Sequence, residues 1–69
     1  MIIIKEAIEK VVKEEGSKYK AAQSLDMQYT MLKNYLKGST RRPQFKTCKI
    51  IYDKYKLVVF PFTEKELQA

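Results

Sequence analysis

The sequence contains no histidine and only one cysteine, Cys48, among its 69 residues. A single cysteine cannot form a disulfide within the chain, and a zinc site lacks most of its usual ligands when histidine is absent. There is also no glycine-rich phosphate loop and no nucleophile–base pair, and the acidic residues are scattered over faces expected to be solvated. We therefore expect no catalytic residues, no metal site, no cofactor and no small-molecule substrate, which makes an enzyme improbable.

Long hydrophobic runs are missing as well. No apolar stretch could span a bilayer, and the opening residues Met1–Ile4 are too few for the hydrophobic part of a signal peptide. Hydrophobic residues make up 45% of the chain and charged residues 32%, which is typical of a globular protein. We expect one small cytoplasmic domain over residues 1–69, with a modest core and no membrane contact.

The positive charge is concentrated in the middle of the chain. The formal net charge is +6, and it divides into −1 for residues 1–15, +7 for residues 16–49 and 0 for residues 50–69. The middle part holds six lysines and two arginines against Asp26 alone. Positive charge that serves only solubility would be spread more evenly along the chain. Its clustering in residues 16–49 therefore favours contact with phosphates.

Residues 17–38 predict two short helices joined by a tight turn. Ser17 is a suitable N-cap for a helix over Lys18–Leu25, Asp26 tolerates the geometry of a turn, and Gly38 suits the end of a second helix over Gln28–Lys37. A 3.6-residue period places the apolar residues of the second helix on one face: Met27, Met31, Leu32, Tyr35 and Leu36. The opposite face carries amide, hydroxyl and ammonium groups and no acid: Gln28, Tyr29, Thr30, Lys33, Asn34 and Lys37.

The remaining segments predict elements that support this unit. An apolar stripe predicts a first helix over Ile3–Glu15, although the β-branched residues Ile2–Ile4 leave a short strand as an alternative. A basic loop with Arg41 and Arg42 leads into a helix over Gln44–Tyr55, whose stripe is Phe45, Cys48, Ile51, Tyr52 and Tyr55. We expect Cys48 to be a small core residue.

The C-terminal tail, residues 56–69, is the hardest segment to interpret. Residues 57–62 are too apolar to be a free end, and Pro61 excludes a regular helix interior. Two alternatives stay open. Residues 58–60 form a strand that pairs with a second copy of the chain, or the segment plugs the core with a loop and a short helix capped by Thr63.

The residues LDMQYTMLKNYLKG, followed by STRRPQF, resemble the helix-turn-helix of the Cro and lambda-type repressor (XRE-like) family. The matching positions are Ala22, Leu25, Met27, Leu32, Tyr35 and Gly38. The likeness covers residues 17–45 well, the first helix by position only and the tail poorly. Two positions depart from the family pattern, because Asp26 replaces its usual glycine and Lys18 replaces a glutamine that contacts phosphate in many members.

The resemblance implies an all-α domain of four or five short helices, with the second motif helix lying in the major groove of DNA. Carried over by position, the base-reading residues are Gln28, Tyr29, Thr30, Lys33 and Asn34. The phosphate-binding residues are Lys18, Lys37, Arg41 and Arg42, with Lys20 and Lys46 as weaker candidates. The chemistry agrees, since Gln and Asn can pair with adenine, Lys with guanine and the Thr methyl with thymine, whereas Tyr29 could instead donate to a phosphate.

We therefore expect a sequence-specific double-stranded DNA-binding regulator of transcription, a repressor of phage or mobile-element type. It would bind a two-fold operator as a homodimer, because one motif covers only a half-site. The alternative is a protein-interaction module that keeps the fold without reading DNA and uses Tyr29 and the apolar tail as contacts. A non-specific nucleoid or RNA binder fits the charge but not the Gln, Thr and Asn side chains.

Overall fold

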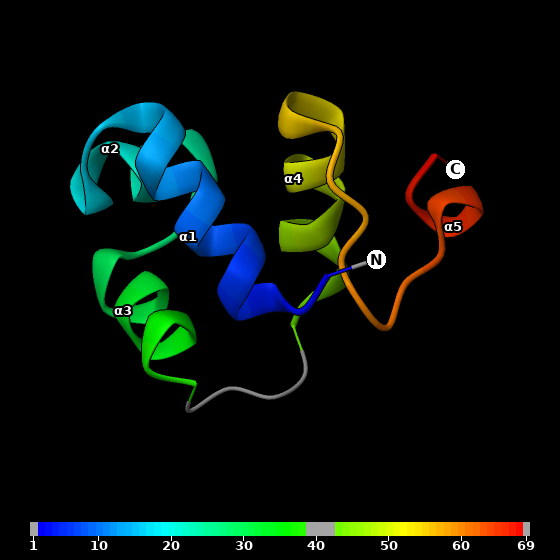
Figure 1. The fold of residues 1–69 in the computed structure, drawn as a ribbon, viewed down its shortest axis with the longest axis horizontal. Coiled ribbons are helices and arrows are strands. Elements are labelled where there is room, and N and C mark those ends of the chain that lie inside the picture. Colours follow the sequence, from blue (N-terminus) through cyan, green and yellow to red (C-terminus); the bar gives the residue numbers. More distant parts are fainter. Residues whose placement is uncertain (1, 39–42, 69) are drawn as a thin grey trace.

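The structure is a computed structural model that describes residues 2–38 and 43–68. In this part of the chain there are five helices: α1 (Ile4–Glu15), α2 (Lys18–Ser24), α3 (Tyr29–Lys37), α4 (Phe45–Tyr55) and α5 (Glu64–Gln68). Helix α1 lies at the centre, with α2 and α3 packed on one side and α4 on the other, and α5 packs on α4 (Figure 1). The expected all-α fold of four or five short helices is confirmed.

Helix α1 buries the stripe that its sequence predicts. Ile4, Ala7, Ile8 and Val11 are buried, and Gly16 ends the helix in the left-handed conformation, at φ 92°. The helix begins one residue later than expected, because Ile3 is extended (φ −78°, ψ 159°) and serves as the N-cap. Since α1 contacts α2, α3 and α4, this buried stripe forms the centre of the core.

The turn between α2 and α3 ends α2 with paired backbone hydrogen bonds. The N–H of Asp26 donates to the carbonyl of Gln23 at 3.2 Å, and the N–H of Met27 donates to the carbonyl of Ala22 at 3.0 Å. This pattern needs a left-handed residue, and Asp26 supplies it with φ 54°. The expectation that Asp26 tolerates turn geometry is confirmed, although α2 ends at Ser24, one residue earlier than expected.

The predicted N-cap of α2 and the predicted C-cap of α3 take the expected positions. The Ser17 hydroxyl accepts the N–H of Lys20 at 3.1 Å, which caps α2, and Gly38 ends α3 in the left-handed conformation. Gln28 is extended and forms the N-cap of α3, so the helix begins at Tyr29 and not at Gln28. Leu32 and Tyr35 are fully buried, and they hold α3 against the rest of the domain.

The stripe predicted for α4 is only partly correct. Thr47, Cys48 and Ile51 are buried, whereas Phe45 is 42% exposed. The ring of Phe45 lies edge-on to that of Phe62, with centroids 5.2 Å apart and an interplanar angle of 76°. The face of α4 that enters the core is therefore turned toward Thr47, and Phe45 packs on the tail at its edge. Burial raises the pKa of the Cys48 thiol to about 12, in keeping with a core residue.

The tail packs on its own domain. The N–H of Ile2 donates to the carbonyl of Val58 at 3.0 Å, and the N–H of Phe60 donates to the carbonyl of Ile2 at 2.7 Å. These bonds form a parallel bridge between Ile2 and Val59, and Val59 is fully buried in the core. The alternative in which residues 58–60 pair with a second copy is wrong for this edge, because Ile2 of the same chain already occupies it.

Helix α5 completes the core as the second alternative predicts. The N–H of Glu66 donates to the Thr63 hydroxyl at 3.2 Å, and the N–H of Thr63 donates to Glu66 Oε1 at 2.9 Å. This reciprocal pair is a capping box, which confirms Thr63 as the N-cap. Leu67, on the next turn, is fully buried.

Candidate nucleic-acid interface

Helix α3 presents a polar surface opposite its buried side. The predicted outer-face residues are all exposed: Gln28, Tyr29, Thr30, Lys33, Asn34 and Lys37. No acidic residue lies anywhere in α3. The sequence-predicted division of this helix into a buried and a polar face is therefore confirmed, and its hydrogen-bonding groups reach solvent.

The polar residues of α3 form two neighbouring rows. Residues four apart lie above one another on a helix, so Tyr29, Lys33 and Lys37 make one row and Thr30 and Asn34 make the next. Within the first row, Lys33 Nζ lies over the ring of Tyr29, 5.5 Å from its centroid. An ammonium at this distance is attracted to the electron-rich face of the ring.

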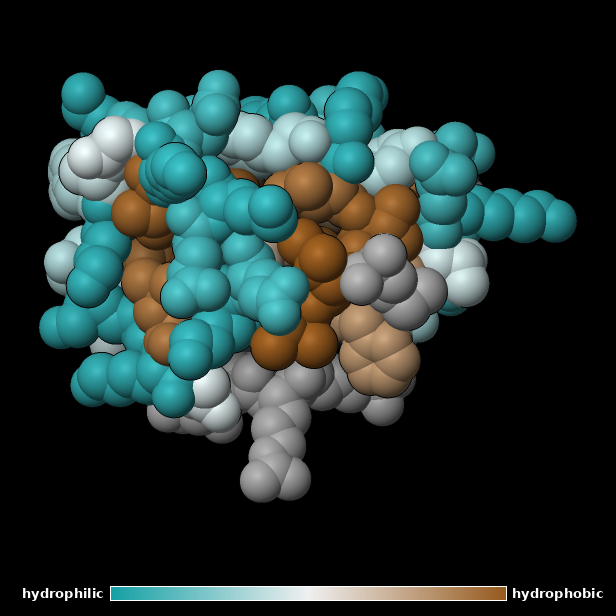
Figure 2. All heavy atoms as spheres, viewed as in Figure 1, coloured by the Kyte–Doolittle hydropathy of each residue, from teal (hydrophilic) through white to brown (hydrophobic). Residues whose placement is uncertain are grey.

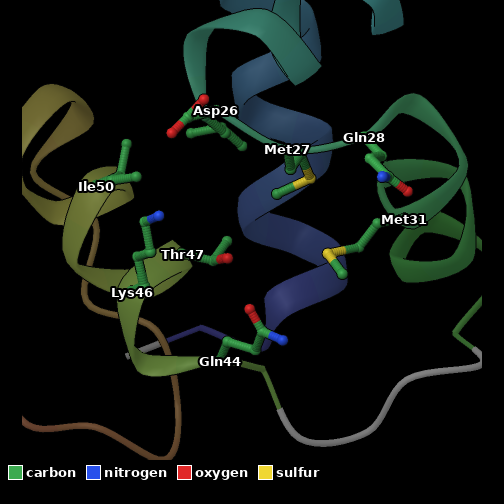
Figure 3. Close-up of a pocket in the computed structure, with 9 residues that line it drawn as sticks. Asp26, Met27, Gln28, Met31, Gln44, Lys46, Thr47 and Ile50 are labelled. Carbon is green, nitrogen blue, oxygen red and sulfur yellow. The ribbon is translucent and has the colours of Figure 1, made fainter.

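Gln28 has a different environment from the other predicted base-reading residues. As the N-cap it borders a groove of about 290 Å³ between the start of α3 and the start of α4. Met27 and Met31 line the groove from the α3 side, and Thr47 and Ile50 face them from α4 (Figure 3). Gln28 can therefore contact a ligand of the groove as well as a ligand of the helix face.

Charged groups also line this groove. Lys46, a weaker phosphate candidate in the sequence, shares it with Gln28, and so does Asp26 (Figure 3). Lys46 is exposed and stands on the first turn of α4, so its ammonium can reach a partner that also contacts the start of α3. The carboxylate of Asp26 would repel an anionic partner at this point, because both carry negative charge. Asp26 is the only acid in residues 16–49.

The remaining phosphate candidates are distributed around α3. Lys18 is exposed and lines a cavity with Leu36, close to the C-terminal half of α3. Glu9 of α1 lines the same cavity, a neighbour that periodicity alone could not reveal because it comes from another helix. Lys20 is exposed on α2. The predicted phosphate contacts Arg41 and Arg42 lie outside the described residues.

Tyr55 belongs to a different, structural cluster. Its hydroxyl donates to Glu15 Oε2 at 2.7 Å and lies 2.5 Å from Ser24 Oγ, so it joins α4 to the C-terminal ends of α1 and α2. Burial raises the pKa of Tyr55 above its usual value; the bond to Ser24 opposes this effect, and the bond to Glu15 adds to it. This cluster holds helices together, and none of its members is a predicted site residue.

Residues 2–38 and 43–68 contain no group of three or more His, Cys, Asp or Glu side chains that could hold a metal ion. Within the same ranges, no helix has the length and apolar character needed to cross a membrane. Comparison of the chain with protein-family models, with curated proteins and with solved structures finds no match. The function is therefore inferred from the chemistry of α3 and its surroundings.

Proposed function

We propose that the chain is a cytoplasmic, sequence-specific double-stranded DNA-binding regulator of transcription, a repressor of the Cro and lambda type from a phage or mobile element. The exposed, acid-free face of α3 carries this proposal. The major groove admits one α-helix, and its base edges offer the acceptors, donors and methyl groups that amide, ammonium and hydroxyl side chains recognise. The resemblance of residues 17–45 to that family supports the same docking mode.

In this proposal α3 supplies the base contacts. Thr30 and Asn34 form one reading row, Tyr29 and Lys33 the other, and Gln28 reads from the N-cap. Lys18 and Lys37 contact phosphates, with Arg41 and Arg42 as further sequence-predicted contacts. The packing of α3 on the rest of the domain matters for this role, because a side chain discriminates between bases only when its distance from the floor of the DNA groove is fixed.

Selection of bound sites from a random duplex pool tests the proposal, with wild type and Asn34→Ala compared. We expect wild type to enrich a two-fold sequence, and we expect the variant to lose definition at one base pair of each half-site. Asn34 is exposed, so the variant should unfold at the same temperature as wild type. Failure of the folded wild-type protein to enrich any sequence would contradict the proposal.

Salt dependence separates this function from the protein-interaction alternative. Contacts to several phosphates release counterions, so the affinity for DNA should fall steeply as the salt concentration rises. An apolar protein interface should change little over the same range. An affinity that does not change with salt concentration would favour the protein-interaction alternative.

A two-fold operator also requires two copies of the chain, and one apolar surface suits that contact. We name it the terminal patch and define it by Ile3, Phe45, Phe60 and Phe62. Ile3 is 51% exposed and Phe60 is 55% exposed, and they directly follow the bridged residues Ile2 and Val59. Figure 2 shows hydrophobic atoms at the surface where the start of the chain meets the C-terminal segment.

The charge distribution favours a second copy on the terminal patch. Most of the patch belongs to residues 1–15 and 50–69, whose net charges are −1 and 0, whereas the intervening part carries +7. Two positively charged copies meet with the least repulsion where the charge is lowest.

Sedimentation equilibrium tests this dimer contact by measuring the dissociation constant of the dimer. Phe60→Ser should weaken the dimer about tenfold. Tyr19→Ser, at a residue that is 63% exposed on α2, is the control. A wild-type protein that stays monomeric both free and on its operator would contradict the homodimer.

A further inference from the structure

We propose that Tyr29 is a positioning residue that holds the Lys33 ammonium for a guanine, so that the two residues together specify one base pair of each half-site. This inference deepens the proposed function and rests on it. Tyr29 opens α3, Lys33 stands one turn later, and Lys33 Nζ lies 5.5 Å from the centroid of the Tyr29 ring. Tyr29 is 44% exposed, so the rest of the protein, Lys33 included, covers part of its surface.

The surroundings of Lys33 leave the ring as its attractive partner on this helix. Helix α3 contains no acid that could form an ion pair with it. A lysine side chain has a flexible four-carbon stem, and it loses many conformations when it is fixed against a partner. A contact that restricts the ammonium before DNA arrives lowers this entropic cost, which is the usual gain from preorganisation.

The chemistry of the ammonium selects the base. A lysine donates hydrogen bonds and cannot accept them. In the major groove guanine offers two acceptors, O6 and N7, whereas adenine offers the acceptor N7 beside the donor N6. A held ammonium therefore favours guanine. Asn34 lies in the neighbouring row, so its own base preference serves as an internal reference in the same experiment.

Two substitutions of Tyr29 separate its ring from its hydroxyl. Tyr29→Phe keeps the ring face, and Tyr29→Leu removes it while retaining an apolar side chain that suits a helix. With base-substituted operators, we expect Tyr29→Leu to lower the preference for guanine about two- to fivefold, and Tyr29→Phe to retain it. In a Lys33→Met background, Tyr29→Leu should have no further effect on that base pair. The preference at the Asn34 base pair should stay unchanged in all variants.

The contact can also be detected without DNA. A ring over an alkyl–ammonium group shifts its methylene protons, so the NMR signals of the Lys33 side chain should move to ordinary values in Tyr29→Leu and not in Tyr29→Phe. Equal loss of guanine preference in Tyr29→Phe would overturn the inference, because the hydroxyl would then be the reader. An unchanged preference in Tyr29→Leu would also overturn it. If wild type selects no sequence at all, the proposed function itself fails, whatever the NMR signals show.

Discussion

The polar side chains of α3 and those of α4 and α5 differ in what they contact. Lys49 of α4 donates to the carbonyl of Leu67 at 3.0 Å, and the hydroxyl of Tyr52 donates to Glu64 at 3.1 Å. In residues 2–38 and 43–68, by contrast, no hydrogen bond joins a side chain of α3 to another group, and the contact of Lys33 with the Tyr29 ring is intrahelical.

This difference indicates which region holds the fold and which is open to a partner. A hydrogen bond formed between an α3 side chain and a ligand replaces a bond to water and breaks no bond within the protein. A new ligand of Tyr52 or Lys49 would compete with an existing bond. Substitutions on the outer face of α3 should therefore change DNA binding with little effect on stability. Substitutions of the buried or hydrogen-bonded side chains of α4, α5 and the tail should do the reverse.

The largest effect is expected in the tail. Leu67→Ala removes a fully buried side chain from α5 and should lower the free energy of unfolding by about 2–4 kcal/mol, because it leaves a cavity in the core. Urea denaturation measures this value. Lys65→Ala, at an exposed residue of the same helix, should change stability by less than about 0.5 kcal/mol. Similar losses in both variants would show that α5 does not complete the core.

The second effect is on binding. If the proposed function holds, Asn34→Ala should weaken the complex with the selected operator by about 1–3 kcal/mol, because it removes the amide that we propose to pair with a base edge. Its unfolding free energy should stay within about 0.5 kcal/mol of wild type, since Asn34 is exposed. Fluorescence anisotropy with labelled operator measures the affinity. A variant that loses stability and affinity together would break the division between the two regions.

The sequence was sufficient to predict the buried helix faces and the helix caps, because both depend on residues that are close together in the chain. The 3.6-residue period predicts the buried faces of α1 and α3 because each helix packs one side against its neighbours. The caps at Ser17, Gly38 and Thr63 follow from residue type. The exposed site residues of α3 follow from the same period. Which bases they read depends on a partner, so their roles stay predictions.

Contacts between distant segments were missed for a common reason. The bridge of Ile2 with Val59 joins the two ends of the chain, and neither segment carries a signal that names the other. The exposure of Phe45 depends in the same way on Phe62 of the tail, and the presence of Glu9 beside Lys18 depends on how α1 meets α2. Such pairings are decided by packing of the whole domain, which a single sequence does not reveal.

The third effect concerns the contact of α4 with α1 and α2. Tyr55→Phe removes the hydroxyl that contacts Glu15 and Ser24, and it should cost about 1 kcal/mol of stability at neutral pH. Because the folded protein raises the pKa of Tyr55 above its usual value of 10.0, this residue stabilises the fold fully below that pH. Its contribution is lost as the pH rises through the folded pKa. Urea denaturation from about pH 9 to about pH 11 should therefore bring wild type and variant closer together. A gap that widens over this range would contradict the raised pKa.

The smallest effect is expected at Asp26, in the turn between α2 and α3. Two substitutions there separate the role of backbone conformation from the role of charge. Asp26 has φ 54°, a conformation in which glycine is unstrained and asparagine behaves much like aspartate. Asp26→Gly should therefore gain about 0.5 kcal/mol of stability, whereas Asp26→Asn should change it by less than that. Both variants remove the only acid of residues 16–49 and raise the net charge from +6 to +7, so both should bind operator DNA more tightly at low salt. Thermal unfolding and anisotropy on the same samples separate the two properties. Tighter binding by Asp26→Gly alone would mean that the turn conformation, and not the carboxylate beside Gln28, controls access to the α3 face.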